Sequence, residues 1–376
     1  MSEQKAIFID RSGWSEPAPK LWEPAIIKGA DFEAEIERLS KIARPNTGRR
    51  QSWIVHPDSH KLGVGLGMAP GVRVVLEVLN PGEQSRPIRH NSTQVNFCIK
   101  GRGHAVVGGK RIDFEQYDAF NFPSMQTYWY VNDGDEVQAR LTYSNAALLE
   151  KMNVHIVEED PPVELQAVGE DKAAKAAHES DPTRKSPYGT FQLTEDGAWL
   201  MPYEILIAPE AVESKALHWP CKKVKQELDK LAALGTDYVG RRLYLLWNPM
   251  TGRTNGTTPN FFATITIRPP GVVDRPHRHV SAAMNYIFGG KGKSNVGGKI
   301  YHWESGDLLL TAPGWEVHNH STLGDEPVYE LTIQDQPINI IMESLLWQED
   351  MKKPWHVLGA EYGFDTNVKT ASKKAG

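Results

Sequence analysis

The amino-acid sequence predicts an all-β fold made of two homologous barrels with a few flanking helices. From about residue 49 to 150, and again from 236 to 340, short runs rich in Val, Ile, Phe and Tyr alternate with Gly, Pro, Asn and Asp turns. That pattern is typical of barrels and sandwiches. The string Val-Gly-Gly-Lys at 107–110 returns 189 positions later at 296–299, and Pro81-Gly82 returns at the same spacing as Pro270-Gly271. The shared spacing indicates an internal duplication.

The first 48 residues are expected to form an extended arm followed by one helix. Up to residue 30 the segment carries Trp14, Trp22 and several prolines, a composition suited to packing on another domain or subunit. Residues 31–43 place apolar side chains at helical spacing, and Asp31 is the expected N-cap. We therefore expect a packing helix here, before the first barrel.

The remaining chain divides at changes of composition. The first barrel is expected over 49–156, followed by a polar linker with a helix over 157–235. Within that linker, residues 222–234 have apolar positions on one helical face. The second barrel is expected over 236–345, and residues 346–376 form a C-terminal tail. A chain of 376 residues is also long enough for two domains, each with a core of its own.

Composition limits the classes of function. The net charge is −5 and no basic face is visible, so we expect no nucleic-acid partner. Only Cys98 and Cys221 are present, which fits a reducing compartment and excludes a cysteine-rich metal cluster. No signal-like segment opens the chain, and no apolar run reaches the roughly 20 residues that span a bilayer. We expect a cytoplasmic protein without membrane contact.

A candidate metal site lies in the second repeat. His277 and His279 stand at i and i+2, so on a β-strand their side chains point to the same face. His318, thirty-nine residues after His279, can complete the set from a neighbouring strand. A lone His-x-His pair is more often structural than a metal ligand, but the spacing of Gly271 and His318 around it favours a metal site. Imidazole ligands alone do not select among Fe, Ni, Cu and Zn.

The first repeat lacks this set. Aligned through Gly82, it has Ile88 at the place of His277, keeps His90 at the place of His279, and has Tyr128 opposite His318. A single imidazole does not hold a metal ion against hydrolysis. We therefore expect the first barrel to have no complete metal site and His90 to be a hydrogen-bonded core histidine.

These motifs resemble the two sequence motifs of the cupin superfamily. The resemblance rests on Gly271 followed by His-x-His, and on Gly306-Asp307 followed by Pro313 five residues before His318. It implies a bicupin, two double-stranded β-helix (jelly-roll) barrels. Metal-binding cupins often add a glutamate three to five residues after the second histidine. Here residues 280–285 are Val-Ser-Ala-Ala-Met-Asn, so the site should consist of three neutral imidazoles.

The three-histidine bicupin resembles the gentisate 1,2-dioxygenase family, which includes salicylate and 1-hydroxy-2-naphthoate enzymes, and the two-subunit hydroquinone dioxygenases. The shared residues are Pro-His-Arg-His at 276–279, His-Asn-His at 318–320 and Gly-Asp-Glu-Pro-Val at 324–328, followed by Asp335 and Pro337. The resemblance implies an Fe(II)-dependent extradiol-type dioxygenase that cleaves a hydroquinone-, gentisate- or salicylate-like ring with O2. In the family the metal lies in the first barrel, whereas here the motif lies in the second.

Three further residues are candidates for the chemistry. His320 has the strand parity of His318, so it either acts as an acid or base on the substrate hydroxyl or only hydrogen-bonds a ligand. The family places an arginine six residues after the second histidine to hold a substrate carboxylate. Here Asn285 occupies that position, so we expect a substrate with a neutral or differently placed polar group and a pocket that includes Asn285 and Thr266.

Two other functions stay open at this point. One is a non-redox cupin that binds metal, and the other is a metal-dependent isomerase or hydrolase that works without O2. Fe(II) is the expected cofactor, and the ligands do not rule out Ni, Mn or Zn. The expected partners are a small aromatic substrate and O2, and aromatic-rich arms favour a homo-oligomer, a dimer or tetramer.

Overall fold

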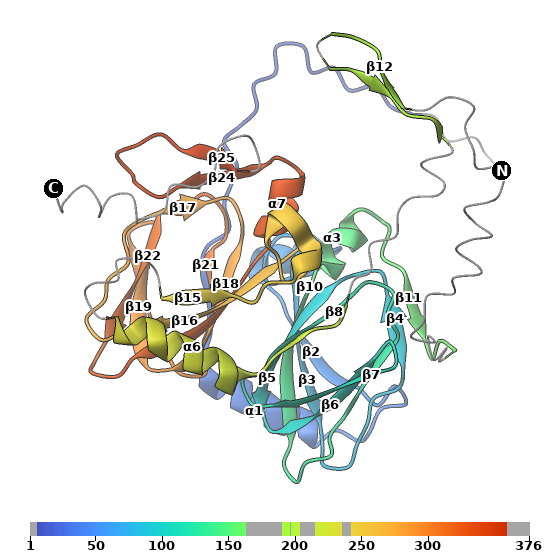
Figure 1. The fold of residues 1–376 in the computed structure, drawn as a ribbon, viewed down its shortest axis with the longest axis vertical. Helices are drawn as coiled ribbons and strands as arrows, with labels where there is room; N and C mark the ends of the chain where they lie inside the picture. Colours follow the sequence, from blue (N-terminus) through green and yellow to red (C-terminus); the bar gives the residue numbers. More distant parts are fainter. Residues whose placement is uncertain (1–5, 163–189, 196, 204–214, 235–241, 359–376) are drawn as a thin grey trace.

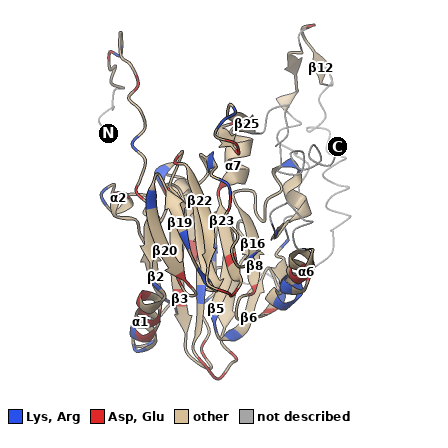
Figure 2. Cartoon of the chain, turned by 90° about the vertical axis from the view of Figure 1, so that its left-hand side faces the viewer, with Lys and Arg blue, Asp and Glu red and all other residues tan. Residues whose placement is uncertain are grey.

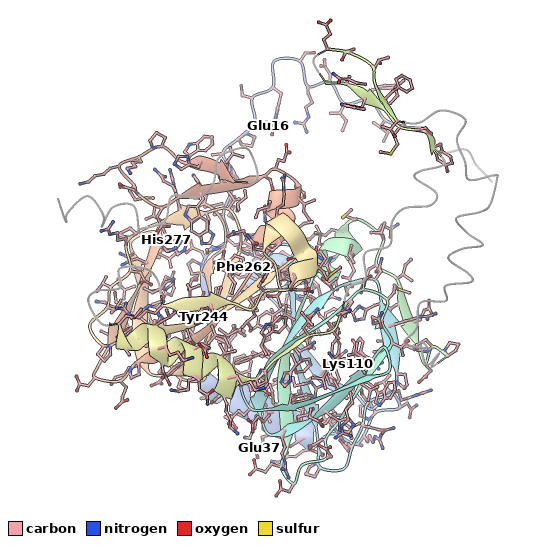
Figure 3. The ribbon with its side chains drawn as sticks, viewed as in Figure 1. Glu16, Glu37, Lys110, Tyr244, Phe262 and His277 are labelled. Carbon is pink, nitrogen blue, oxygen red and sulfur yellow. The ribbon has the colours of Figure 1, made fainter. Side chains whose placement is uncertain are left out.

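The computed structural model describes residues 6–162, 190–195, 197–203, 215–234 and 242–358. Within these ranges the chain is mostly β-strand and forms two barrels packed against each other (Figure 1). Figure 3 shows His277 in the second barrel and Lys110 in the first. The predicted fold, two β-barrels with few helices, is confirmed. No helix in the described ranges is long and apolar enough to cross a bilayer.

The first barrel is built of two antiparallel sheets. Their strand orders are β14-β8-β5-β10-β3-β2 and β11-β4-β9-β6-β7. The strands are β2 (Arg50–Ile54), β3 (Arg73–Leu79), β4 (Ile88–His90), β5 (Gln94–Lys100), β6 (Arg102–Val107), β7 (Lys110–Glu115), β8 (Ala119–Phe122), β9 (Tyr128–Val131), β10 (Gln138–Ser144), β11 (Val157–Glu159) and β14 (His218–Trp219).

The second barrel repeats this plan. A six-stranded sheet has the order β1-β21-β18-β23-β16-β15, and smaller sheets have the orders β20-β19-β22 and β17-β24-β25. The strands are β1 (Ala25–Ile27), β15 (Leu243–Leu245), β16 (Phe262–Arg268), β17 (Arg278–His279), β18 (Ala283–Gly289), β19 (Lys291–Val296), β20 (Lys299–Glu304), β21 (Leu308–Ala312), β22 (His318–Leu323), β23 (Val328–Gln334), β24 (Leu345–Gln348) and β25 (His356–Leu358).

The two barrels exchange edge strands. β1, from the N-terminal arm, pairs with β21 of the second barrel. β14, from the segment between the barrels, pairs with β8 of the first barrel. Each exchanged strand is followed by a helix, α1 (Gly29–Ser40) after β1 and α6 (Cys221–Ala233) after β14. Each barrel is therefore completed by the strand that precedes the other. The boundaries at 49–156 and 236–345 stay a prediction.

Two aspartates at corresponding positions of the two barrels form hydrogen bonds to the exchanged segments. Asp307 Oδ1 accepts a hydrogen bond from the Gly29 amide at 2.8 Å, at the start of α1. Asp118 Oδ1 accepts one from the Cys221 amide at 2.7 Å, at the start of α6. A carboxylate at a helix N-terminus satisfies an otherwise unpaired amide and favours the helix dipole. The Gly306-Asp307 motif thus joins the N-terminal arm to the second barrel.

Both predicted helices are present, with shifted ends. The helix expected over 31–43 is α1, which starts at Gly29 because Asp307 binds its first amide. Asp31, the expected N-cap, is instead the third residue of the helix, and its side chain accepts from the amide of Lys28, the actual N-cap, at 3.2 Å. The helix expected over 222–234 is α6. Figure 2 shows both signs of charge side by side along these two helices.

The remaining described elements are short. They are α2 (Pro57–His60), α3 (Ala146–Lys151), α7 (Gln336–Ile341), a 3₁₀ segment at Pro249–Thr254, and a two-stranded hairpin of β12 (Phe191–Gln192) and β13 (Trp199–Leu200).

The largest core lies between the two barrels. Alternate residues of β3, β5 and β10 meet alternate residues of β16, β18 and β23 there, together with apolar positions of α1 and α6. Because strand side chains alternate faces, the other half of each strand points into its own barrel. In the first barrel that interior is a separate cluster rich in aromatic residues. In the second barrel most inward positions of β16 and β23 are polar instead, and they line the site.

Candidate active site

The three predicted ligand histidines come together inside the second barrel. His279 lies on β17 and His318 opens β22, while His277 forms an isolated bridge with His318. All three are buried, and one ring nitrogen of each lies within 4.8 Å of those of the other two. The structure therefore groups the predicted residues in a geometry suited to a single metal ion.

Backbone carbonyls select the tautomer of all three rings. Nδ1 of His277 lies 3.0 Å from the Arg275 carbonyl, Nδ1 of His279 lies 2.8 Å from that of Ser281, and Nδ1 of His318 lies 3.0 Å from that of Glu316. A carbonyl only accepts, so each Nδ1 carries the proton. The lone pair of each such ring is then on Nε2, the nitrogen through which a metal would bind.

A tryptophan from the predicted C-terminal tail stacks on two histidines of the triad, His277 and His279. Trp347 lies on β24, which pairs with β17, and its ring stacks on His279 with 4.7 Å between centroids. Its Nε1 donates to Glu349 Oε2 at 3.0 Å. The flat apolar ring shields one side of the histidines from water, which strengthens electrostatic interactions there.

His320 is held by a chain of two hydrogen bonds. Trp303 Nε1 donates to Ser294 Oγ at 2.8 Å, and Ser294 Oγ lies 2.8 Å from His320 Nδ1. Because Trp303 can only donate, the Ser294 hydroxyl satisfies its own proton best by donating to His320. His320 then has its lone pair on Nδ1 and its proton on Nε2, the opposite tautomer to the three ligands.

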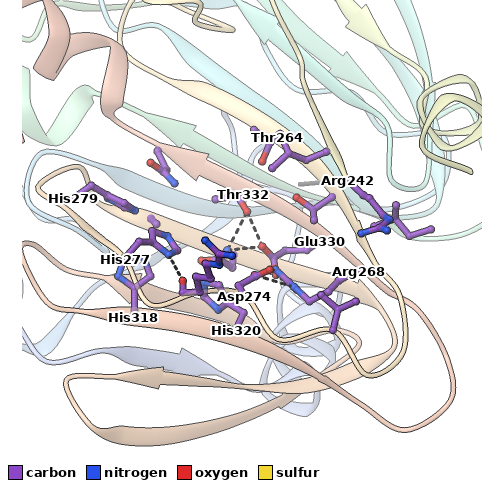
Figure 4. Close-up of a pocket in the computed structure, with 18 of the residues that line it drawn as sticks. Arg242, Thr264, Arg268, Asp274, His277, His279, His318, His320, Glu330 and Thr332 are labelled. Carbon is purple, nitrogen blue, oxygen red and sulfur yellow. Dashed lines mark hydrogen bonds and ion pairs between the residues drawn. The ribbon is translucent and has the colours of Figure 1, made fainter. Parts of the chain in front are cut away.

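A pocket of about 540 Å³ opens beside the triad. Its walls come from inward positions of β15, β16, β18 and β23, and they include the predicted residues Asn285, Thr266 and His320. The histidines lie at one end and Arg242 and Arg268 at the other (Figure 4). The volume falls in the range usual for small-molecule sites.

The side chain of Asn285 is engaged by the wall of the pocket. Its Nδ2 donates to Glu330 Oε1 at 2.7 Å and to Thr332 Oγ1 at 3.0 Å. Its Oδ1 accepts from Thr311 Oγ1 at 2.6 Å. Both amide hydrogens are therefore used within the protein, and Asn285 shapes the site by positioning its neighbours.

Beyond Asn285, the far end of the pocket holds a buried ion cluster. Arg268 Nη1 lies 3.3 Å from Glu330 Oε2, and Arg268 Nη2 lies 3.1 Å from Asp274 Oδ2. Burial lowers the pKa of Arg268, but the charges of the two carboxylates outweigh it and raise the pKa overall. Arg268 therefore stays charged and is shared between two carboxylates.

The equivalent place in the first barrel is closed. His90 Nδ1 lies 3.0 Å from the Ser92 carbonyl, and its Nε2 accepts from the Tyr128 hydroxyl at 2.9 Å. Burial lowers the pKa of His90 to about 4. His90 is half-buried, and both of its ring nitrogens have hydrogen-bond partners within the first barrel.

A second group with metal-ligand atoms lies on the surface of the first barrel. It consists of His104, Asp113 and Asp133, and Arg111 forms ion pairs with both carboxylates at 2.7 and 3.0 Å. The arginine supplies the positive charge that a cation would bring, so we assign this group as an ion-pair network.

Comparison with known proteins agrees with this architecture. The cupin domain family model matches residues 75–144 and 264–333, one match in each barrel. A 5-nitrosalicylic acid 1,2-dioxygenase from Bradyrhizobium sp is 32% identical over 156 residues, covering 40% of this chain and 72% of the relative. A gentisate 1,2-dioxygenase from Haloferax sp is 26% identical over 327 residues, covering 84% of this chain and 85% of the relative.

The chain belongs to the bicupin family of gentisate and salicylate 1,2-dioxygenases. The salicylate 1,2-dioxygenase from Pseudaminobacter salicylatoxidans shares the fold, with a TM-score of 0.68, 17% identity, and coverage of 90% of this chain and 93% of that one. Relatives in this family are ring-cleaving aromatic 1,2-dioxygenases, as the sequence motifs predicted.

Four residues of the site were not identified from the sequence alone. They are Trp347, Ser294, Trp303 and Glu330. In β23, polar Glu330 and Thr332 alternate with apolar Leu331 and Ile333, a pattern that normally places the polar face in water. Here the apolar face packs between the barrels and the polar face lines the pocket. The alternation identifies the two faces of β23 from the sequence. Which of them lines the barrel interior depends on packing between distant segments.

Proposed function

We propose that this protein is an Fe(II)-dependent dioxygenase that cleaves the ring of a hydroxylated aromatic compound with O2. The observation that carries the proposal is the buried triad of His277, His279 and His318 opening onto a pocket large enough for an aromatic ring. Membership in a family of aromatic 1,2-dioxygenases supports the same reaction.

The donor set fits a divalent transition metal. His277, His279 and His318 would hold the ion through three imidazole nitrogens beside the pocket, a donor set suited to such a metal. Bound iron would supply a coordination site for an ionised substrate oxygen and for O2, together with the electrons that activate O2. The protein contributes a neutral ligand set, so the charge of an ionised substrate is favoured at this end.

His320 is proposed to act directly on the substrate. Its Nε2 carries the proton in the tautomer that Ser294 selects, and its ring lies 5.8 Å from that of His318 between centroids. It can therefore donate a hydrogen bond to a substrate oxygen near the triad and keep that oxygen oriented. Trp303 and Ser294 position His320 for this role.

The substrate is proposed to be hydroquinone-like rather than a carboxylated phenol. Asn285 brings no positive charge to the pocket wall, and Thr266 adds only a hydroxyl. Relatives act on gentisate, 5-nitrosalicylate and 1-hydroxy-2-naphthoate, and a solved salicylate 1,2-dioxygenase with 16% identity and a TM-score of 0.68 forms adducts with gentisate. These names mark the chemical range from which candidates should be drawn.

Oxygen uptake by iron-loaded protein tests the function. The protein should be reconstituted anaerobically with ferrous iron and assayed against hydroquinone, gentisate, salicylate and substituted phenols. We expect consumption of one O2 for each ring lost, and none in the His318→Ala variant. Turnover that continues without O2 would instead assign an isomerase or hydrolase. Tight Zn or Ni binding without any turnover would assign a non-redox metal-binding protein.

A further inference from the structure

We propose that Glu330 determines substrate specificity by accepting a hydrogen bond from a donor group on the substrate, at the end of the ring remote from the metal. This inference rests on the proposed function, since it concerns the same pocket. It names the substrate class more narrowly: an aromatic with a hydroxyl or amino group at the position that faces Glu330, and without a carboxylate there.

Glu330 is a buried carboxylate in the wall of a cavity. It lies on β23 directly opposite Thr266 of β16, and both residues line the pocket. Only 3% of its surface is exposed. Figure 4 shows Glu330 and Thr332 between the histidines and Arg268. A ring bound at the triad therefore extends toward Glu330.

Glu330 is anchored but retains acceptor capacity. Oε1 accepts from Asn285 Nδ2 at 2.7 Å and from Thr332 Oγ1 at 2.8 Å, while Oε2 accepts from Arg268 Nη1 at 3.3 Å. An ionised carboxylate offers about four acceptor positions, so three bonds leave room for one more. The bond to Arg268 is also long for a charge-assisted contact, so Oε2 is the atom best suited to a substrate donor.

The cluster of Arg268, Glu330 and Asp274 disfavours an anionic group next to Glu330. Arg268 is shared between Glu330 and Asp274, so the three side chains together carry one net negative charge. A substrate carboxylate here would meet Glu330 without a matching cation from this cluster. A buried acceptor that faces a group unable to donate costs binding free energy. Sites of this kind therefore discriminate strongly against substrate analogues that lack the donor.

Arg242 offers the competing explanation. It lines the same end of the pocket and could bring positive charge to a substrate carboxylate. If Arg242 dominates recognition, carboxylated phenols bind best and Glu330 only anchors Arg268. The two explanations predict opposite orders of substrate preference.

Two matched variants separate the role of the Glu330 carboxylate from that of net charge. Glu330→Gln removes one negative charge and the carboxylate acceptor, whereas Asp274→Asn removes one charge from the same cluster and leaves Glu330 in place. Glu330→Asp, which keeps the charge on a shorter side chain, is the second variant should Glu330→Gln fail to fold. The probes are hydroquinone, its methyl ether 4-methoxyphenol, which lacks the second donor, and gentisate.

The measurements are kcat/KM from oxygen uptake and, anaerobically, binding of the same probes to iron-loaded protein by calorimetry. We expect the native protein to prefer hydroquinone over 4-methoxyphenol by roughly 10-fold or more. Glu330→Gln should reduce that ratio to within about 3-fold, Glu330→Asp should lower it, and Asp274→Asn should keep it.

The outcomes distinguish this inference from the proposed function. An unchanged ratio in Glu330→Gln, or a preference for gentisate that Arg242→Gln removes, overturns the role of Glu330 while ring cleavage stands. If no probe is turned over but calorimetry shows the expected ratios, the role of Glu330 in binding is upheld and the dioxygenase proposal fails.

Discussion

The two barrels share one backbone plan and differ in what fills their interiors. Arg140 and Glu77 face each other on β10 and β3 of the first barrel, as Glu330 and Thr266 do on β23 and β16 of the second. In the first barrel the buried arginine bonds Glu77 at 2.9 Å and covers the ring of Tyr130. In the second barrel the smaller threonine leaves a cavity.

The polar pair next to these positions is common to both barrels. Asn96 is opposite Thr142 as Asn285 is opposite Thr332. In the first barrel Asn96 Oδ1 accepts from the Tyr130 hydroxyl at 2.8 Å, so the ring occupies the interior. The same register thus supports either a packed core or a pocket, and the volume of a few inward side chains decides which.

The histidine that both barrels keep is held in the same way. Nδ1 of His90 faces the carbonyl and hydroxyl of Ser92, as Nδ1 of His279 faces those of Ser281. The first barrel therefore orients one imidazole as a metal site would. Ile88 and Tyr128 stand where the second barrel has His277 and His318, and Tyr128 donates to the nitrogen that a metal would take.

The largest expected effect separates the barrels by metal binding. His277→Ala, His279→Ala or His318→Ala should each lower metal affinity by more than roughly 100-fold, since even outer residues of metal sites commonly account for 10–100-fold. His90→Ala should leave affinity unchanged. Metal content by mass spectrometry and titration calorimetry check this. Loss of metal from the His90 variant would mean that the first barrel also holds an ion.

The next effect comes from filling the second barrel as the first is filled. Thr266→Glu combined with Glu330→Arg copies the pair formed by Glu77 and Arg140. We expect phenol binding to fall more than about 100-fold, because the new side chains occupy the cavity, while the triad still binds metal. Calorimetry with each ligand gives both values. Undiminished phenol binding would show that the aromatic ring binds elsewhere.

A smaller effect is expected at the hydrogen-bond chain that orients His320. Ser294→Ala should lower kcat about 10-fold with little change in KM or metal content, because His320 loses the donor that fixes its tautomer. Added to His320→Ala, it should have no further effect, since both changes remove one function. Additive losses would mean that Ser294 acts independently of His320.

The smallest effects are opposite pH dependences of stability. Burial holds the pKa of His90 near 4, so the unfolded chain binds a proton that the folded chain does not, and stability falls as pH drops from about 6.5 toward 4. Burial raises the pKa of Asp335 to about 7, so the folded chain binds a proton that the unfolded chain does not. Stability therefore falls as pH rises from about 4 to 7.

Thermal melting of metal-free protein across this range tests both signs. Relative to the native protein, His90→Phe should become less sensitive to acid, and Asp335→Asn should lose the decline toward neutral pH. Each slope is at most about 1.4 kcal/mol per pH unit. Parallel curves for Asp335→Asn and the native protein would contradict the raised pKa of Asp335.

Much of the fold could be predicted from the sequence because its signals are local or repeated. Helices α1 and α6 follow from apolar spacing, and the two barrels follow from the duplicated turns. The exchanged strands β1 and β14 could not be predicted. They are only three and two residues long, and their partners lie far along the chain.

The sequence by itself determined the duplication, the three histidines of the second barrel and the replacement of two of them in the first. These depend on residue type and on spacing along strands, which a linear chain records. Only the tertiary structure decided that the polar faces of β16 and β23 enclose a pocket, that Trp347 stacks on His277 and His279, and that Glu330 lies in the pocket wall. Period-two alternation defines two faces of a strand, but contacts between distant segments determine which face encloses the interior.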